Sequence, residues 1–293
     1  MRVNRNIIYT SLAIVLLMGL ISVAIIPGFA ARHRGSVQQV AKDIQPMQAT
    51  QETEKASLSV QDPRPVAKAL EELEAKYGWV ITYEDPLYLH PSETADVTTQ
   101  VRKDLGKFRN GEAPRVLIPA GGSLAITYDV MSDTKLPVDR DAVVRKVLNA
   151  SQTAGVSRFR LEREKDNAML HAIAAVNKNA SGALVPHAAV LDAVISLSQG
   201  DRTSLQTLHA ICEAVSQATG THVEVGAVPL GLFMNHRDNE VVVSQKARDV
   251  LVQTLERTGS GTNLSWQLLY DPGMKTYYLN IHIVPAPKAA ANE

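Results

Sequence analysis

The stretch ARDVLVQTLERTGSGTNLSWQLLY, residues 247–270, contains the pattern that most restricts how this chain folds. Apolar residues recur at helical spacing over 247–258, which predicts a helix with one buried face. Gly259 and Gly261 then predict the end of that helix, and apolar residues at every second position over 264–270 predict a half-buried strand. A helix and a strand that each bury one face favour a layered fold of mixed helices and strands.

The same alternation of helices and strands extends through residues 187–285. Gly220 occupies the position of a left-handed helix cap, and Pro272 and Gly273 predict a type II turn between two strands. In chain order the segment is strand, helix, strand, strand, helix, strand, strand. The predicted elements are 189–198, 201–220, 221–225, 239–244, 247–258, 264–270 and 275–284.

Residues 65–178 give a similar order. Gly78 and Gly155 predict the ends of two helices, and Asp139 or Asp141 is placed to cap the second helix. The predicted elements are a helix over 66–78, strands over 79–83 and 123–130, a helix over 139–155, and strands over 157–163 and 167–177. The repeated order predicts a tandem duplication. We therefore expect an α+β fold of two tandem modules of β-α-β-β-α-β-β type, the first at 65–178 and the second at 187–285.

The N-terminus predicts export. Residues 7–26 contain no charge and are long enough to span a bilayer, and Gly28 and Ala30 have the small-x-small spacing of a signal-peptidase site. Arginines flank both sides, so the charges do not decide orientation. We expect residues 1–30 to be a cleaved signal peptide or a retained membrane anchor with its helix at 7–26. The remainder is then periplasmic or otherwise extracytoplasmic. The polar residues 31–64 predict a disordered linker and residues 286–293 a disordered tail.

Composition excludes one class of partner and one kind of stabilisation. Thirty basic and thirty acidic residues cancel, and aromatic residues make up only 5 % of the chain. A chain with neither a basic field nor stacking platforms is not expected to bind nucleic acid. The single cysteine, Cys212, cannot form an internal disulfide, so packing alone must hold the fold together.

Two short motifs have the spacing of chemical sites but lack the required context. Ser132 and Lys135 form S-x-x-K, yet they lie in a loop and no K-T-G partner exists. His209 and Cys212 are three residues apart on a predicted helix, which supplies too few ligands for zinc. Cys212 belongs to the apolar stripe, so a buried thiol is expected. His171 and His282 lie within predicted strands, where a half-buried structural histidine is ordinary.

The remaining polar clusters also have structural explanations. Glu84 and Asp85 are adjacent on an extended chain, so their side chains should point to opposite faces, and Asp85 before a proline favours a turn. The glycines of residues 119–123 lack the lysine of a phosphate loop and predict a hairpin turn. Arg158, Arg160 and Arg163 alternate with the acids Glu162 and Glu164, which predicts a solvated strand face. We therefore expect no catalytic residue, no metal ligand and no cofactor.

The second stretch resembles a known family. Its helix ending in Thr-Gly, its following strands and its second helix with a closing hairpin are similar to the short N-terminal domain of secretins and TonB-dependent receptors. The matching positions are Leu205, Leu208, Thr219, Gly220, Val223, Val225, Ala247, Leu251, Leu255, Gly259, Leu264 and Trp266. The first stretch resembles a more divergent copy. The resemblance implies a periplasmic, non-enzymatic module for protein–protein contact, with no catalytic residues. No secretin pore or receptor barrel follows, so we expect paired modules on a tether.

Three functions follow from these patterns. The first is an exported, non-enzymatic interaction or assembly module of the cell envelope, whose partner is another protein or a second copy, and whose N-terminal segment engages the membrane. The second is an enzyme with its site in the cleft between the two modules, near the long loop 85–115 that contains His90, Glu93 and Asp96. The third is a small-ligand or cell-wall-binding protein that uses the same region.

Overall fold

The computed structural model describes residues 52–104, 108, 113–152, 155, 157–164 and 169–287. The predicted leader 1–30, most of the predicted linker and residues 288–293 lie outside these residues. Within the described ranges, no helix is both long and apolar enough to cross a membrane. Thr50–Glu293 forms one compact unit, so both predicted modules are halves of the same body.

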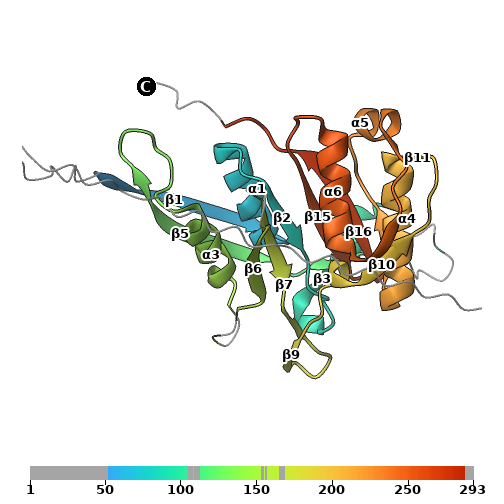
Figure 1. Cartoon of the computed structure of the whole chain (residues 1–293). Coiled ribbons are helices and arrows are strands. Elements are labelled where there is room, and N and C mark those ends of the chain that lie inside the picture. The colour runs from blue at the N-terminus through green and yellow to red at the C-terminus, as the bar shows by residue number, and fades with distance from the viewer. Residues whose placement is uncertain are drawn as a thin grey trace, which may run out of the picture. The chain divides into compact units, whose positions relative to one another are not determined.

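The first half contains two principal helices and five principal strands (Figure 1). They are β1 (Thr53–Asp62), α1 (Pro65–Tyr77), β2 (Ile81–Glu84), β5 (Gly122–Met131), α3 (Arg140–Ala150), β6 (Phe159–Arg163) and β7 (Leu170–Ala174). Short elements occupy the loop between β2 and β5: the 3₁₀ helix η1 (Pro91–Glu93), β3 (Thr94–Asp96), α2 (Thr98–Val101) and β4 (Leu117–Pro119). The loop predicted at 85–115 therefore contains short elements of its own, among them the β3–β4 pair.

The second half repeats this order after a short connection. The connection contains β8 (Val176–Lys178), β9 (Leu184–Pro186) and the 3₁₀ helix η4 (Val190–Asp192). The principal elements are β10 (Val194–Leu197), α4 (Ser204–Thr219), β12 (His222–Val225), β14 (Val242–Lys246), α6 (Ala247–Gly259), β15 (Leu264–Asp271) and β16 (Thr276–Ile283). The short elements β11 (Arg202–Thr203), α5 (Leu230–Asn235) and β13 (Arg237–Asp238) lie between them. The α+β class is confirmed.

Strand pairing is the same in the two halves, not only the order of elements. In the first half, β1 pairs antiparallel with β5, β2 parallel with β7, and β6 antiparallel with β7. In the second half, β10 pairs antiparallel with β14, β12 parallel with β16, and β15 antiparallel with β16. Each half is thus a two-stranded and a three-stranded sheet. The three-stranded sheets have the same register, whereas β10–β14 has a register shift between Ile195 and Leu197 that β1–β5 lacks.

The helices of each half lie between its two sheets. In the first half, apolar residues of α1 and α3 share one core with β1 and β5 on one side and with β2, β6 and β7 on the other. The second core uses α4 and α6 in the same way, around the fully buried Trp266. Val143, Val144 and Leu148 of α3 correspond to Val250, Leu251 and Leu255 of α6, and all six are buried. This matching stripe is what the helical spacing predicted.

The two halves join in a single six-stranded sheet, in the order β12-β16-β15-β2-β7-β6. The joint is the parallel pair β15–β2, in which Gln267 lies opposite Tyr83 and Leu268 opposite Glu84. Tyr83 belongs to the first core and Leu268 to the second, so the two cores lie on opposite faces of the sheet. The helices α1 and α3 therefore cover one face, and α4 and α6 cover the other.

Several local predictions were wrong. Residues 53–62, predicted as linker, form β1, because Ala56, Leu58 and Val60 alternate toward α1 and β5 even though most of the segment is polar. The helix predicted to end at Gly155 ends at Ala150. The predicted strand at 189–198 is helical in its first part, as η4.

Turns also differed from their predictions. Residues 119–123 connect β4 to β5 but are not a hairpin, because β4 pairs with β3 and β5 pairs with β1. Gly121 has a left-handed φ of 68°, and a side chain there would collide with the carbonyl of Asp62. The turn at Pro272 is not type II, since the left-handed residue is Lys275 and not Gly273. Asp271 accepts the amide hydrogens that shape this turn.

Candidate functional site

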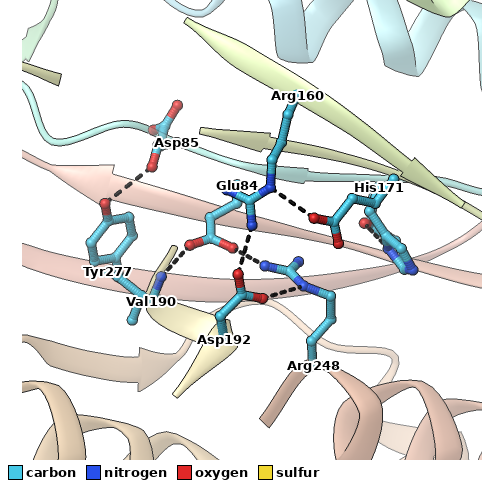
Figure 2. Close-up of polar contacts among 10 residues, drawn as sticks. Glu84, Asp85, Arg160, His171, Val190, Asp192, Arg248 and Tyr277 are labelled. Atoms are coloured by element: carbon cyan, nitrogen blue, oxygen red, sulfur yellow. Dashed lines mark hydrogen bonds and ion pairs between the residues drawn. The ribbon is translucent and has the colours of Figure 1, made fainter. Parts of the chain in front are cut away.

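Two buried carboxylates, Glu84 and Asp85, lie at the end of β2, where the two halves join. Glu84 is 1 % exposed and accepts hydrogen bonds from Arg248 Nη2, at 2.7 Å, and from the Val190 amide (Figure 2). Arg248 Nε also bonds Asp192 at 3.2 Å, and the second oxygen of Asp192 accepts from Arg160 at 2.6 Å. This chain of charges links β2, η4, α6 and β6.

A buried histidine lies beside this charge chain. His171 on β7 bonds Thr82 Oγ1 through Nδ1 at 2.8 Å, and its ring lies 5.4 Å from that of Trp266. Burial, with the positive charge of Arg248 as a further cause, lowers the pKa of His171 to about 4. The ring is therefore neutral near pH 7 and acts as a hydrogen-bonding part of the packing.

Asp85 forms a second polar centre on the opposite face. Its carboxylate is fully buried and accepts four hydrogen bonds: from Arg64 Nε at 2.6 Å, Tyr83 OH at 2.7 Å, Tyr88 OH at 2.8 Å and the Tyr270 amide at 2.9 Å. Burial and the negative charge of Asp85 raise the pKa of both tyrosines well above the ordinary value, so they remain donors. Tyr270 belongs to the second half, so this centre also spans the joint.

These two centres attach the halves rather than perform chemistry. Glu84 and Asp85 lie on opposite faces, as the alternation predicted, but Asp85 is not a turn former. A carboxylate that is buried and accepts four hydrogen bonds has its negative charge compensated within the fold. Removing one partner of such a pair is costly, because the other charge is left buried and unpaired. The joint therefore depends on buried charges whose partners come from both halves.

The two outer strands of the sheet are a different kind of feature. Among the described residues, β6 pairs only with β7 and β12 only with β16, so each leaves one open edge. On β12 the Val223 amide bonds Ser216 Oγ at 2.9 Å instead of a strand, and Val225 is placed to point its amide the same way. The side chains of His222 and Glu224 are exposed there and pair at 2.8 Å. We call β6 and β12 the open edges.

A polar cavity of about 330 Å³ lies at the end of β6 nearest the long loop. Arg158 Nη1 pairs with Glu93 at 2.8 Å across it, and Lys178 Nζ donates to Ser92 Oγ at 3.1 Å. The Nε and Nη2 atoms of Arg158 are buried and have no hydrogen-bond partner among the described residues. We call this cavity the Arg158 pocket.

The Arg158 pocket contains no assembled catalytic group among the described residues. Ser92 Oγ lies 2.7 Å from His90 Nδ1, but the same nitrogen accepts the Ser92 amide and caps η1, so the contact is a local helix cap. A larger cavity of about 490 Å³ lies where α1 and α6 end, lined by Trp79, Met169 and Leu264 among others. Five of its lining residues belong to or pack against the two cores, and residues such as Arg140, Glu256 and Asn263 line the rest.

The motif residues singled out from the sequence are dispersed. Ser132 and Lys135 lie in an exposed turn, where Lys135 Nζ pairs with Glu54 at 2.8 Å. Cys212 is buried, as expected, and burial raises its pKa to about 12. His209 is exposed, so it cannot share a metal with Cys212. The described residues contain no group of three or more potential metal ligands.

The other polar residues singled out from the sequence are the arginines near β6 and the acidic and histidine residues of the 85–115 loop. Arg160 pairs with Asp192 and Arg163 with Asp141, and their side chains are 33 % and 56 % exposed. Arg158 pairs with Glu93 and is only 15 % exposed, so the strand face predicted to be solvated is solvated only in part. Asp96 accepts hydrogen bonds from Thr98, which lower its pKa, and it lies outside the Arg158 pocket. Of the three loop residues proposed for a site, only Glu93 lines that pocket.

Sequence reasoning missed four residues of the joint: Arg64, Tyr88, Asp192 and Arg248. Arg64 lies in a segment predicted as linker, and Arg248 follows the first residue of a helix, where a charge is normally solvated. The Arg248 side chain is instead 4 % exposed. The available signal was Glu84, because an acid on the second face of a strand with an apolar first face needs a partner if that face is covered.

Comparison with known proteins finds no matching family model, no matching curated protein and no matching solved structure.

Proposed function

We propose that this chain is an exported, non-enzymatic module that binds a protein partner in the cell envelope by strand addition at its open edges. The observation that carries the proposal is that, among the described residues, each end strand of the six-stranded sheet has one edge without a paired strand. Exposed strand edges present rows of amide and carbonyl groups that favour pairing with another chain. The uncharged N-terminal segment supports the location, and the resemblance to secretin and receptor short N-terminal domains supports the class of function.

The geometry of the joint supports edge pairing as the means of contact. Parallel pairing of β15 with β2 already attaches one half to the other, so this unit is suited to edge-to-edge contact. Exposed apolar residues lie near the β12 half, including Leu230 and Met234 of α5 and Val243 of β14. Such residues favour contact with protein surfaces once a strand has paired.

Site-specific photocrosslinking in the cells that express the chain tests this proposal. A photoreactive residue at Glu224 on β12 or at Glu162 on β6 is expected to form a product with an envelope protein or a second copy. The same residue at Glu72, which is exposed on α1, is the matched control and should form none. Val225→Pro removes the open-edge amide and should abolish the β12 product. Absence of products at both edges would exclude the proposal.

A second candidate function, binding of a small anion, is favoured by the Arg158 pocket. Two buried nitrogens of Arg158 have no partner among the described residues, and Lys178 adds a positive charge at the rim. Carboxylate and phosphate groups match the planar donors of arginine. Titration calorimetry with inorganic phosphate and with succinate should then detect binding that Arg158→Gln abolishes and Arg163→Gln retains. Equal heats for the three proteins would rule this function out.

A further inference from the structure

The two open edges are the same two edges that the joint uses. The helix caps Gly78 and Gly220 align the halves, and on this alignment β2 corresponds to β12. The strand registers then align β15 with β6, because Tyr270 and Arg163 occupy the same place opposite the paired inner strand. The joint pairs a β15-type edge with a β2-type edge. Among the residues that the structure describes, one edge of each type has no paired strand, namely β6 and β12.

Orientation allows the same contact to be repeated between molecules. Within one copy, β15 runs antiparallel to β16 and parallel to β2, and β12 runs parallel to β16. The second half therefore points opposite to the first, with its helices on the opposite face. If another half pairs with β6 as β2 pairs with β15, its strands must run in the same direction as those of the second half. A second copy in the same orientation supplies such a half, and its β12 then lies parallel to β6.

We infer that copies of this chain assemble head to tail, β6 of one copy pairing in parallel with β12 of the next and thereby repeating the β15–β2 joint. This inference rests on the proposed function and names its partner as a second copy. The register of the joint places Arg160 opposite Val225 of the next copy, and Leu161 opposite its Gly226. Because the two contacting edges differ, the assembly is an open chain or a ring and not a two-fold dimer.

Side chains at corresponding positions fit this contact. In the joint, Gln267 Nε2 donates to Glu71 Oε1 at 3.0 Å. Arg160 occupies the position of Gln267, and Glu213 on α4 occupies the position of Glu71. Repeating the joint therefore brings Arg160, which within one copy pairs with Asp192 and Glu162, to an exposed glutamate of the next copy.

The positions on the open edges that correspond to the buried charges of the joint do not carry those charges. Arg248, which binds Glu84 in the joint, corresponds to Asp141 on the β6 side. A glutamate on β12 at the position equivalent to Glu84 would lie close to Asp141 of the neighbouring copy, and the two negative charges would repel each other. The residue corresponding to Glu84 is Gly226, and the residue corresponding to Asp85 is Ala227. At the positions of Glu84 and Asp85 the β12 edge therefore carries no charge, and the contact lacks the buried ion pairs of the joint.

Disulfide trapping with the full-length chain tests the direction and register of assembly. Arg160→Cys and Val225→Cys are expressed on two copies with tags of different size, and the unmodified chain, whose only cysteine is buried, is the control. We expect a mixed disulfide dimer, no dimer from either variant alone, and a ladder of multimers from the double variant. Self-crosslinking by either single variant at a similar yield, or absence of the mixed dimer, would overturn the inference.

A charge exchange tests the same contact without cysteines. Crosslinking of one copy to another from a photoreactive residue at Glu224 should fall about fivefold in Arg160→Glu and in Glu213→Arg, and recover in the double variant. Within one copy Arg160 lies on β6, whereas Glu213 lies on α4, which packs against β12 at the other end of the sheet, so recovery can arise only between copies. Glu72→Arg is the matched control. Products at Glu224 with a different protein, and none with a second copy, would refute self-assembly and leave the proposed function intact.

Discussion

The joined strand β2 and the open strand β12 occupy the same place in two halves with the same pairing, yet they end differently. After the shared helix cap, β2 leads to Glu84 and Asp85, whereas β12 leads to Gly226 and Ala227. The first pair is fully buried and anchors the other half, while the second pair carries no charge. The residues at the end of these two equivalent strands are thus one difference between the joined edge and the open edge.

A third position shows how little separates the two states. Glu74 Oε1 accepts the Ile81 amide at 2.9 Å, and Ser216 Oγ accepts the Val223 amide at the same distance in the other half. Both side chains thus perform the same local task. Glu74 has a second oxygen, and this oxygen bonds His282 of the second half at 2.8 Å. Ser216 has a single side-chain oxygen, and the Val223 amide that it accepts belongs to its own half.

The largest effect is expected at Arg248. Arg248→Met leaves Glu84 as a buried charge with a single amide donor, and should lower the free energy of unfolding by about 3–5 kcal/mol. Asp141→Asn, at the corresponding position of α3, is the control and should cost less than about 1 kcal/mol, because that site is partly solvated. Urea unfolding of the full-length chain measures both. Similar losses for the two variants would contradict the distinction between joined and open edges.

Asp85 is expected to come next. Asp85→Asn keeps the size of the side chain but offers one acceptor oxygen to four donors and points an amide group at tyrosine hydroxyls. The expected loss is about 2–3 kcal/mol in the free energy of unfolding. Ala227→Asn makes the matching change on the open edge and should alter stability by less than about 0.5 kcal/mol. A neutral Asp85→Asn would show that the joint does not depend on this carboxylate.

The contact between Glu74 and His282 should make the joint depend on pH. Burial lowers the pKa of His282, but the hydrogen bond and charge of Glu74, with the charge of Glu71, outweigh it and leave the pKa raised. The folded chain therefore holds the proton more tightly than the unfolded chain. This stabilisation is fully present below the unfolded value of about 6.5 and is lost as pH rises through the folded pKa.

The variant His282→Gln isolates this contribution. His171 acts in the opposite direction, because its folded pKa of about 4 means that stability rises with pH between that value and about 6.5. The difference in urea midpoint between the unmodified chain and His282→Gln should be largest below pH 6.5 and shrink toward pH 8. A difference that stays constant across this range would exclude protonation of His282 as its cause.

Local elements were predictable because their signals are local. The glycine caps at 78 and 220 and the apolar stripe of α6 follow from spacing within one element, and the structure contains them. Strand β1 was missed because only Ala56, Leu58 and Val60 of its residues face the core, which leaves its composition close to that of a linker.

The joint was not predictable for a different reason. Its centres combine Arg64, Asp85 and Tyr270, or Glu84, Asp192 and Arg248, which are far apart in the chain and meet only after the sheet has formed. No spacing rule connects such residues. What the sequence does contain is the difference between the ends of two equivalent strands, and this difference gains meaning only when the pairing is known.

The smallest effect is expected at Ser216, whose hydroxyl accepts a hydrogen bond from the Val223 amide on the open edge. Ser216→Ala should lower the free energy of unfolding by about 0.5–1.5 kcal/mol and speed hydrogen exchange at Val223, because the amide then turns to water. Ser216→Glu introduces the residue found at position 74, and its carboxylate can still accept the Val223 amide. It should therefore retain both stability and slow exchange. If Ser216→Glu instead exchanged as fast as Ser216→Ala, the two halves would differ at this position in more than the reach of one side chain.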